Sequence, residues 1–385
     1  MGHDVIVAAA ETHGPKDEKV FVFAKPIEWN IMGRLARFGW PRFRGSTLAA
    51  IRLIKYIKRE KPDIVNIHLL HGGRLNLYYL LKFLGKHQIK TVVTNHAELY
   101  YTGCCEHAYD CMNWVNSECR ECPNIRYATY AYVFGNAHMH WKLMKKAFSY
   151  FSPIFLTFTA VSPWLKDRFY LSPIVKGFDC TAVLNGLDAS IFSRKSCSPD
   201  VLDRIGQYAP KYILHVTASF NPESISDVKG GYYLVELAKR MPERTFLIVC
   251  TAARGIELLP PNIIVWGKAK DQEELAQLYS QARMTIIVSR RETFSMVTAE
   301  SLCCGTPVVG FKAGGPESIA IKEVSRFVEQ GDVDSLVEAI QEMDSSILDR
   351  NVISKQARDK YCSQTMAKNY MSVYETLLNN FDLER

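Results

Sequence analysis

Short apolar runs alternate along the chain with longer segments in which apolar residues recur at helical spacing. In the first half, runs rich in Val and Ile predict strands at residues 4–10, 20–24, 64–68, 91–95, 158–161 and 181–184. Residues 46–61 and 74–86 predict amphipathic helices, because Leu, Ile and Tyr recur on one face and Lys and Arg occupy the other. Strands that alternate with helices are typical of parallel sheets with crossover helices.

The pattern starts again after residues 193–210, a polar stretch with Ser, Asp and Pro that predicts a linker. Strands are expected at residues 212–218, 245–250, 263–265, 285–289, 308–311 and 326–328, with helices at 231–241, 272–283, 295–304 and 333–343. Residues 354–385 predict a closing C-terminal helix. We therefore expect an α/β chain with two doubly wound, Rossmann-like domains, residues 1–192 and 211–353, that face a cleft at the carboxyl ends of their strands.

The composition agrees with two folded domains. The chain has 385 residues, of which 48% are hydrophobic and 23% charged, and these values exclude a disordered, collagen-like or disulfide-scaffold protein. The net charge of +7 suits anionic ligands or an anionic membrane surface without requiring nucleic acid. The first residues lack a basic leader followed by an apolar run, so we expect a cytoplasmic location in which the 11 cysteines are not paired as disulfides.

Segment 289–317 carries the richest candidate chemistry. Glu292 is expected in a loop at the carboxyl end of a strand, and Glu300 lies eight residues later inside the following helix, so both carboxylates can face one cleft. Free N–H groups at the start of that helix, including those of Thr293, Phe294 and Ser295, favour a bound phosphate. Because a carboxylate accepts hydrogen bonds from a pair of sugar hydroxyls, the segment suits a nucleotide sugar.

This segment resembles the retaining GT-B glycosyltransferases of family four. Their motif is a Glu, seven residues, a second Glu, a Gly-Thr-Pro-Val-Val stretch and a Gly-Gly segment that ends in Glu, found here as Glu292, Glu300, residues 305–309 and residues 314–317. The Lys-Gly-Gly at 229–231, residues 271–283 and the Asn-Gly-Leu-Asp at 185–188 also agree. The resemblance covers nearly the whole chain and implies nucleotide-sugar-dependent transfer of the polysaccharide-biosynthesis type.

The resemblance also implies roles for individual residues. Glu300 would bind the ribose hydroxyls of the donor, Glu292 would hold the transferred sugar, and Lys229 would neutralise the donor's diphosphate. The family pairs this lysine with an arginine that the preceding loop lacks here, and Arg290 or Arg291 could replace it electrostatically. With positive charge supplied in this way, the resemblance implies that the chemistry requires no divalent metal.

Histidines in the first half add a second candidate group. His96 follows the strand at 91–95 and is expected at a carboxyl end that faces the cleft, where relatives place a histidine near the acceptor or the transferred sugar. A structural histidine at a strand end is the alternative. His68 is expected to pack structurally, and His71 has either a packing or a cleft-lining role.

Residues 102–123 form a cysteine-rich insertion with the spacing C-x5-C-x7-C-x2-C, given by Cys105, Cys111, Cys119 and Cys122. Four thiolates suit tetrahedral zinc, and a subset of the resembled family carries a similar pattern, which favours a structural zinc site. Free thiols packed in the insertion, or a redox pair, are the alternatives. The aromatic and basic segment 29–44 predicts either peripheral contact with an anionic membrane, at its inner face, or a mobile cleft loop.

Together these features predict a hexosyltransferase that moves a sugar from a nucleotide diphosphate sugar to a hydroxyl of a saccharide or lipid-linked saccharide, with retention. A nucleotide-sugar epimerase of the same fold is an alternative, whereas a zinc-bearing nucleic-acid-binding protein would leave Glu292 and Glu300 unexplained. The chain opens where the second strand of the resembled family begins. We therefore expect a truncated first domain that lacks its first strand and helix, or a sheet that has rearranged to close the gap.

Overall fold

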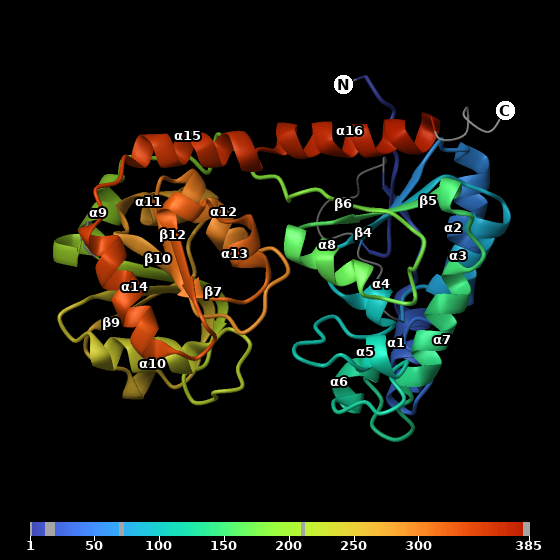
Figure 1. Ribbon diagram of the computed structural model, residues 1–385, viewed down its shortest axis with the longest axis horizontal. Coiled ribbons are helices and arrows are strands. Elements are labelled where there is room, and N and C mark those ends of the chain that lie inside the picture. Colours follow the sequence, from blue (N-terminus) through green and yellow to red (C-terminus); the bar gives the residue numbers. More distant parts are fainter. Residues whose placement is uncertain (1, 12–19, 69–72, 209–211, 380–385) are drawn as a thin grey trace. The chain divides into compact units, whose positions relative to one another are not determined.

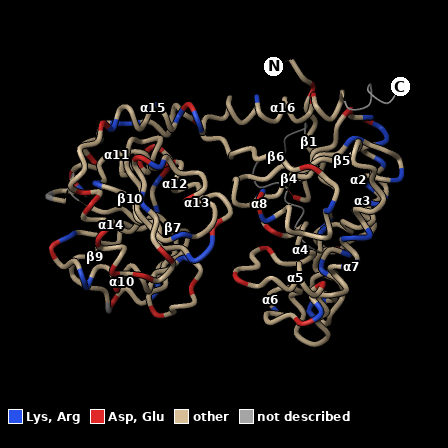
Figure 2. Tube along the Cα trace, viewed as in Figure 1, with Lys and Arg blue, Asp and Glu red and all other residues tan. Residues whose placement is uncertain are grey.

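The computed structural model describes residues 2–11, 20–68, 73–208 and 212–379. The chain forms two compact units. Unit 1 consists of Met1–Ala160, Leu165–Ala182 and Ser372–Arg385, and unit 2 of Val161–Trp164 and Val183–Met371. Basic and acidic residues are interspersed along the trace of each unit (Figure 2). Among the described helices, none combines the length and the apolar character that a bilayer crossing requires.

Unit 1 contains two parallel sheets, one of β1 and β2 and one of four strands in the order β3-β4-β5-β6. All five residues of β4 are buried, as expected for a strand covered on both faces. Helices α2, α3 and α7 pack in sequence along one flank (Figure 1). The elements from the start of the chain to β6 are β1 (Val7–Ala9), β2 (Val20–Val22), α1 (Pro26–Arg37), α2 (Thr47–Glu60), β3 (Val65–Ile67), α3 (Leu77–Lys86), β4 (Thr91–Asn95), α4 (Leu99–Thr102), α5 (Asn113–Asn116), α6 (Ile125–Thr129), α7 (Ala137–Phe148), β5 (Leu156–Ala160), α8 (Pro163–Tyr170) and β6 (Cys180–Ala182).

The end of the chain returns to complete unit 1. Val373 and Leu377, in the second half of α16 (Ser363–Asn379), are buried. The side chain of Asn66, in β3, donates a hydrogen bond of 2.7 Å to the hydroxyl of Tyr374. Lys90 donates a hydrogen bond of 2.8 Å to the carbonyl of Leu378. The first and last parts of the chain therefore share one hydrophobic and polar contact region.

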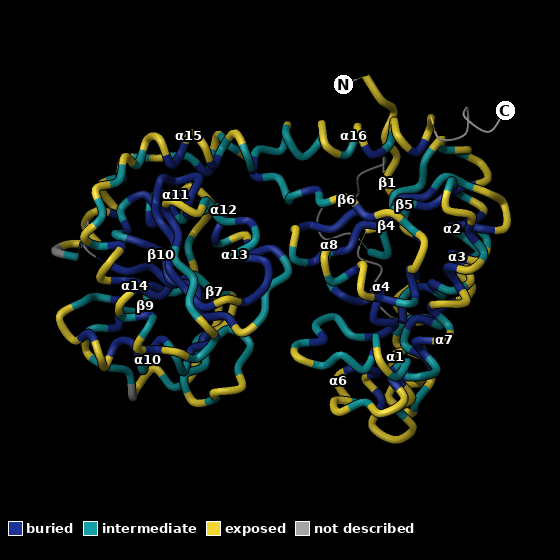
Figure 3. The backbone as a smooth tube through the Cα atoms, viewed as in Figure 1, coloured by how far each residue is buried: buried dark blue, intermediate teal, exposed yellow. Residues whose placement is uncertain are grey.

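Unit 2 is built on one parallel sheet in the order β12-β11-β10-β7-β8-β9, with helices on both faces (Figure 1). Its strands lie at the buried centre and its helices carry the exposed positions (Figure 3). From β7 the chain builds outward through β8 and β9, then returns to place β10 on the other side of β7. Its elements are α9 (Pro199–Ile205), β7 (Ile213–Phe220), α10 (Gly231–Arg240), β8 (Phe246–Ala253), β9 (Ile263–Gly267), α11 (Gln272–Gln281), β10 (Met284–Ile287), α12 (Met296–Cys303), β11 (Val308–Phe311), α13 (Gly315–Ile319), β12 (Ser325–Val328), α14 (Val333–Ser345), α15 (Arg350–Tyr361) and α16.

Two segments differ from the sequence prediction. The closing helix, expected without interruption over residues 354–385, begins at Arg350 and is divided at Cys362 into α15 and α16. The division occurs where Leu187 pairs with the backbone, donating to the Tyr361 carbonyl at 2.7 Å and accepting from the Ser363 N–H at 2.9 Å. The expected linker, residues 193–210, contains α9, which begins at a proline and is held by the buried Val201 and Ile205.

Candidate active site

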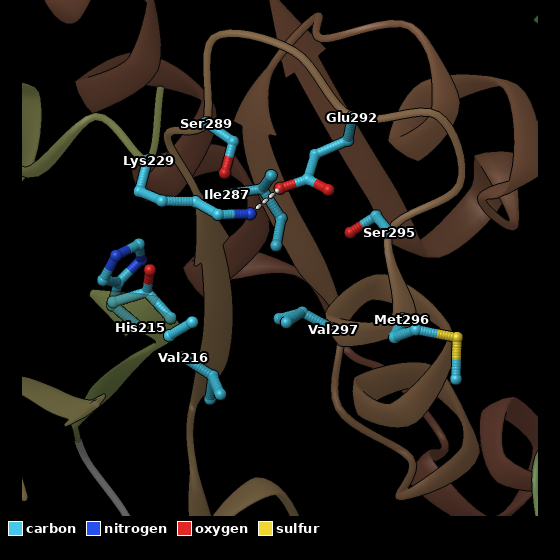
Figure 4. A pocket seen from close by; sticks show the side chains of 11 residues that line it. His215, Val216, Lys229, Ile287, Ser289, Glu292, Ser295, Met296 and Val297 are labelled. Carbon is cyan, nitrogen blue, oxygen red and sulfur yellow. Dashed lines mark hydrogen bonds and ion pairs between the residues drawn. The ribbon is translucent and has the colours of Figure 1, made fainter. Parts of the chain in front are cut away.

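A cavity of about 260 Å³ opens in unit 2 beside β7 and β10 (Figure 4). These two strands are neighbours at the point where the order of the sheet reverses, and doubly wound sheets bind ligands at the carboxyl side of such a point. The cavity therefore lies where the fold favours a ligand. It is lined by His215, Val216, Thr217, Ala218, Lys229, Ile287, Ser289, Glu292, Ser295, Met296 and Val297.

Lys229 and Glu292 meet in this cavity although they lie on different loops. The Lys229 ammonium is 2.8 Å from Oε1 of Glu292, and Figure 4 shows the two side chains reaching toward each other across the site. The backbone of Glu292 is held by Ala313 and Gly315, through hydrogen bonds of 3.0 and 2.8 Å. An incoming anion can therefore replace the Glu292 carboxylate as the partner of Lys229, whose ammonium is already in place.

The loop that carries Lys229 depends on the glycine that follows it. Gly230 has a φ of +73°, and a Cβ at this position would lie 1.9 Å from the carbonyl oxygen of Val288. Arg290 lies two residues after Val288, and its N–H donates a hydrogen bond of 2.8 Å to the Val228 carbonyl. The loop thus passes directly over the end of β10, and only a residue without a side chain permits this approach.

The start of α12 lies against the same cavity. Ser295 precedes the helix with a φ of +77°, and its hydroxyl accepts a hydrogen bond of 3.3 Å from the Thr298 N–H. Two other residues expected at this helix start also make structural contacts. The Thr293 carbonyl accepts a bond of 2.6 Å from the Ser162 hydroxyl, and Phe294 is buried. Neither Thr293 nor Phe294 lines the cavity with its side chain.

Glu300, Arg290 and Arg291 do not line this cavity. Glu300 lies within α12 and accepts a hydrogen bond of 2.9 Å from the Tyr279 hydroxyl. Burial raises the pKa of Glu300, and this hydrogen bond offsets part of the rise. The guanidinium of Arg291 lies 5.3 Å from the centre of the Trp164 ring, and Arg290 is exposed. The structure therefore brings Lys229 and Glu292 together but leaves the other three outside the cavity lining.

His215 is a cavity residue that the sequence prediction missed. Its Nδ1 lies 3.3 Å from the carbonyl oxygen of Ile286, so this nitrogen carries the proton and donates. Its Nε2 is buried and has no hydrogen-bond partner among the described residues. Burial lowers the pKa of His215 to about 4. The neutral ring therefore offers an unused acceptor. The sequence signal that could have identified His215 is a histidine within the otherwise apolar first half of β7.

In unit 1, His96 follows β4 as expected and pairs with a second histidine. Its Nε2 lies 3.0 Å from Nδ1 of His68, so one ring donates and the other accepts. Burial, and the neighbouring His68, lower the pKa of His96 to about 4. His68 was expected to serve packing alone, and the structure makes it the hydrogen-bond partner of His96. His71 lies outside the described residues.

The cysteine-rich insertion was expected to hold structural zinc. Among the residues that the structure describes, no group of three or more His, Cys, Asp or Glu side chains is arranged to hold a metal ion. Burial raises the pKa of the Cys119 thiol, and its sulfur lies 3.9 Å from the carbonyl oxygen of Thr102. The neighbouring thiols of Cys105, Cys122 and Cys111 raise the pKa of Cys119 further. The insertion is folded around free thiols, at Cys104, Cys105, Cys111, Cys119 and Cys122.

Comparison with known protein families identifies the family. The family described as Glycosyltransferase Family 4 matches residues 1–190, and the family described as Glycosyl transferases group 1 matches residues 254–360. The chain belongs to the GT-B glycosyltransferases. The second match includes the loop of Glu292 and all of α12, so the cavity lies partly within it.

Relatives of this GT-B glycosyltransferase are distant in sequence. It is 22% identical over 325 residues to the putative colanic acid biosynthesis glycosyl transferase WcaC of Escherichia coli (strain K12), covering 82% of this chain and 77% of that protein. It is 23% identical over 208 residues to N-acetyl-alpha-D-glucosaminyl L-malate synthase of Bacillus anthracis. This second match covers 52% of the chain and 53% of the relative, so it spans about half the length of that protein.

A solved structure shares the α/β fold. Anabaena Alr3699/HepE, solved in complex with UDP-glucose, aligns with a TM-score of 0.57 and 16% identity, over 92% of this chain and 86% of that chain. The same protein has also been solved with UDP, with a TM-score of 0.58. At this level of identity, the similarity establishes the GT-B fold with its two Rossmann-like units.

Proposed function

We propose that the chain transfers a hexosyl group from a nucleotide diphosphate sugar to a hydroxyl of a saccharide or lipid-linked saccharide, with net retention, in the synthesis of surface or extracellular polysaccharide. The observation that carries the proposal is the pair of Lys229 and Glu292 in a cavity at the reversal point of the unit 2 sheet. The nucleotide sugar bound by HepE and the biosynthetic role in the name of WcaC support it.

In the proposed reaction the bond between the sugar's anomeric carbon and the diphosphate oxygen breaks, and its electron pair stays on the diphosphate. Lys229 and the N-terminus of α12 stabilise the negative charge that develops there. The acceptor oxygen bonds to the anomeric carbon, and its proton is released. Glu292, freed from Lys229, accepts hydrogen bonds from hydroxyls of the transferred sugar, and Glu300 binds the ribose.

His215 and His96 complete the proposed set of polar groups. His215 lines the donor cavity, and its buried Nε2, which has no hydrogen-bond partner among the described residues, would accept a hydrogen bond from a hydroxyl of the donor. We assign His96 to the acceptor or the transferred sugar, as the family resemblance implies.

Binding of free nucleotides tests the donor site directly. Calorimetric titration with UDP, GDP and ADP would identify the base, and Lys229→Ala should weaken binding of the preferred nucleotide by about 10- to 100-fold, because it removes charge-assisted bonds to phosphate. The exposed Lys355 provides a matched control, because Lys355→Ala removes a cation from the same unit outside the cavity. Equal affinity of the Lys229→Ala variant and the wild type would exclude this donor site.

Turnover separates the role of Glu292 from that of Lys229. Glu292→Gln should bind the free nucleotide nearly as well as the wild type, because a nucleotide without sugar offers no hydroxyls to this carboxylate. Its transfer rate from the nucleotide sugar should fall instead. The anomeric configuration of the new glycosidic bond, compared by NMR with that of the donor, tests retention.

A further inference from the structure

Helix α1 in unit 1 presents its apolar residues outward. Ile27, Ile31 and Leu35 are spaced four residues apart and are exposed by 68%, 50% and 40%. Phe38, directly after the helix, continues the row and is 66% exposed. Ala36 is the one residue of α1 that is buried. A surface helix normally turns such a row toward the core, so this row is available to something outside the unit.

A loop that follows α6 extends the row. Val133 and Phe134 are exposed by 56% and 74%. Backbone contacts hold this loop beside the end of α1: the Tyr132 N–H donates to the Arg37 carbonyl at 2.8 Å, and a Cβ on Gly39 would lie 2.4 Å from the Phe134 carbonyl oxygen. Two segments that are about 100 residues apart in sequence therefore form one apolar patch, here named the α1 surface: Ile27, Ile31, Leu35, Phe38, Val133 and Phe134.

The α1 surface is accompanied by positive charge. Residues 25–44 contain five basic residues and one acidic residue, Glu28. Both carboxylate oxygens of Glu28 bind Arg52, at 2.9 and 2.5 Å, so this acid is already neutralised. Lys25, Arg34 and Arg37 are exposed, and within the described part of the chain none of them has an ion pair. The charge left available next to the apolar row is therefore positive.

We infer that the α1 surface docks on an anionic lipid bilayer. Its Ile, Leu and Phe side chains would enter the boundary between headgroups and acyl chains, while the adjacent Lys and Arg contact lipid phosphates. A second copy of the chain would cover the apolar row but would bring the same cations face to face. The inference goes beyond the proposed transfer reaction and does not depend on it.

Cosedimentation of the full chain with vesicles tests the docking. Vesicles of phosphatidylcholine with phosphatidylglycerol should bind the chain, and pure phosphatidylcholine vesicles or high salt should bind it much less. The double variant Ile31→Ser/Phe38→Ser should bind at least about tenfold more weakly. Ile347→Ser is the matched control, because Ile347 is fully exposed and belongs to unit 2, outside the α1 surface. Arg34→Gln/Arg37→Gln should remove the preference for anionic vesicles.

The circular dichroism and thermal midpoint of each variant show whether it is folded. If the apolar double variant is not folded, the Arg34→Gln/Arg37→Gln variant supplies the test, since among the described residues these exposed side chains have no ion pair to lose. Docking is overturned if the wild type ignores anionic vesicles, if both double variants bind like the control, or if the apolar substitutions abolish a dimer and leave vesicle binding intact. Because no donor or acceptor is present, such a failure leaves the proposed transferase activity standing.

Discussion

The buried His215 should make the chain less stable in mild acid. Its folded-state pKa is lowered from 6.5 to about 4 by burial. As the pH falls through 6.5, the unfolded chain takes up this proton first, so stability is lost progressively until the pH reaches the folded pKa. With about 1.4 kcal/mol per pKa unit, the full loss is on the order of 3 kcal/mol, of which about 2 kcal/mol is reached at pH 5.

Urea unfolding at pH 7.5 and pH 5.0, followed by circular dichroism, measures this loss. His215→Phe keeps a ring in β7 but cannot take up a proton, so the variant should lose about 2 kcal/mol less than the wild type between the two pH values. All other titrating groups are shared and cancel in the comparison. His140→Phe repeats the test in unit 1, where burial lowers the pKa of His140 to about 4 as well. Equal acid losses in the wild type and the His215 variant would refute the reasoning.

Three further predictions use contacts described by the structure. Glu300→Gln should weaken nucleotide binding by on the order of 1.5–3 kcal/mol, measured by calorimetry, because a neutral amide accepts weaker bonds from ribose hydroxyls; unchanged affinity would exclude the ribose role. Hydrogen bonds from Thr365 lower the pKa of Cys362, whereas burial raises that of Cys119, so peptide mapping after iodoacetamide at pH 7.5 should find Cys362 alkylated faster. Glu317→Ala should cost about 1–3 kcal/mol in urea unfolding, since this carboxylate accepts the N–H groups of Ala313 and Gly314 at 3.0 and 2.7 Å; a variant as stable as the wild type would show that water replaces it.

The fold could be predicted because central parallel strands are covered on both faces and therefore form continuous apolar runs. β7 and β10, at Ile213–Phe220 and Met284–Ile287, lie within two residues of the ends expected from sequence at 212–218 and 285–289. The family resemblance also implied that Lys229 and Glu292 would act on the same donor, and the structure brings their side chains within 2.8 Å of each other.

What the sequence could not supply depends on distant neighbours. The role of His215 follows from the carbonyl of Ile286 and from a cavity that other segments complete. Likewise, cysteine spacing states how many residues separate the thiols but not which way each one points, and Cys119 points toward a backbone carbonyl. The division between α15 and α16 was hidden because Leu187, far away in sequence, inserts its backbone there.

The return of α16 to unit 1 affects the order in which a newly made chain can fold. Unit 2 has all of its residues once Met371 has emerged from the ribosome. Unit 1 begins earlier but still lacks Val373, Leu377 and the hydroxyl that binds Asn66, which arrive last. Domains generally fold as they emerge, first made and first folded. Here the unit that begins first must wait for residues made after unit 2, so a nascent chain that is stalled or cleaved before Ser372 would expose the older half of the protein to chaperones and proteases.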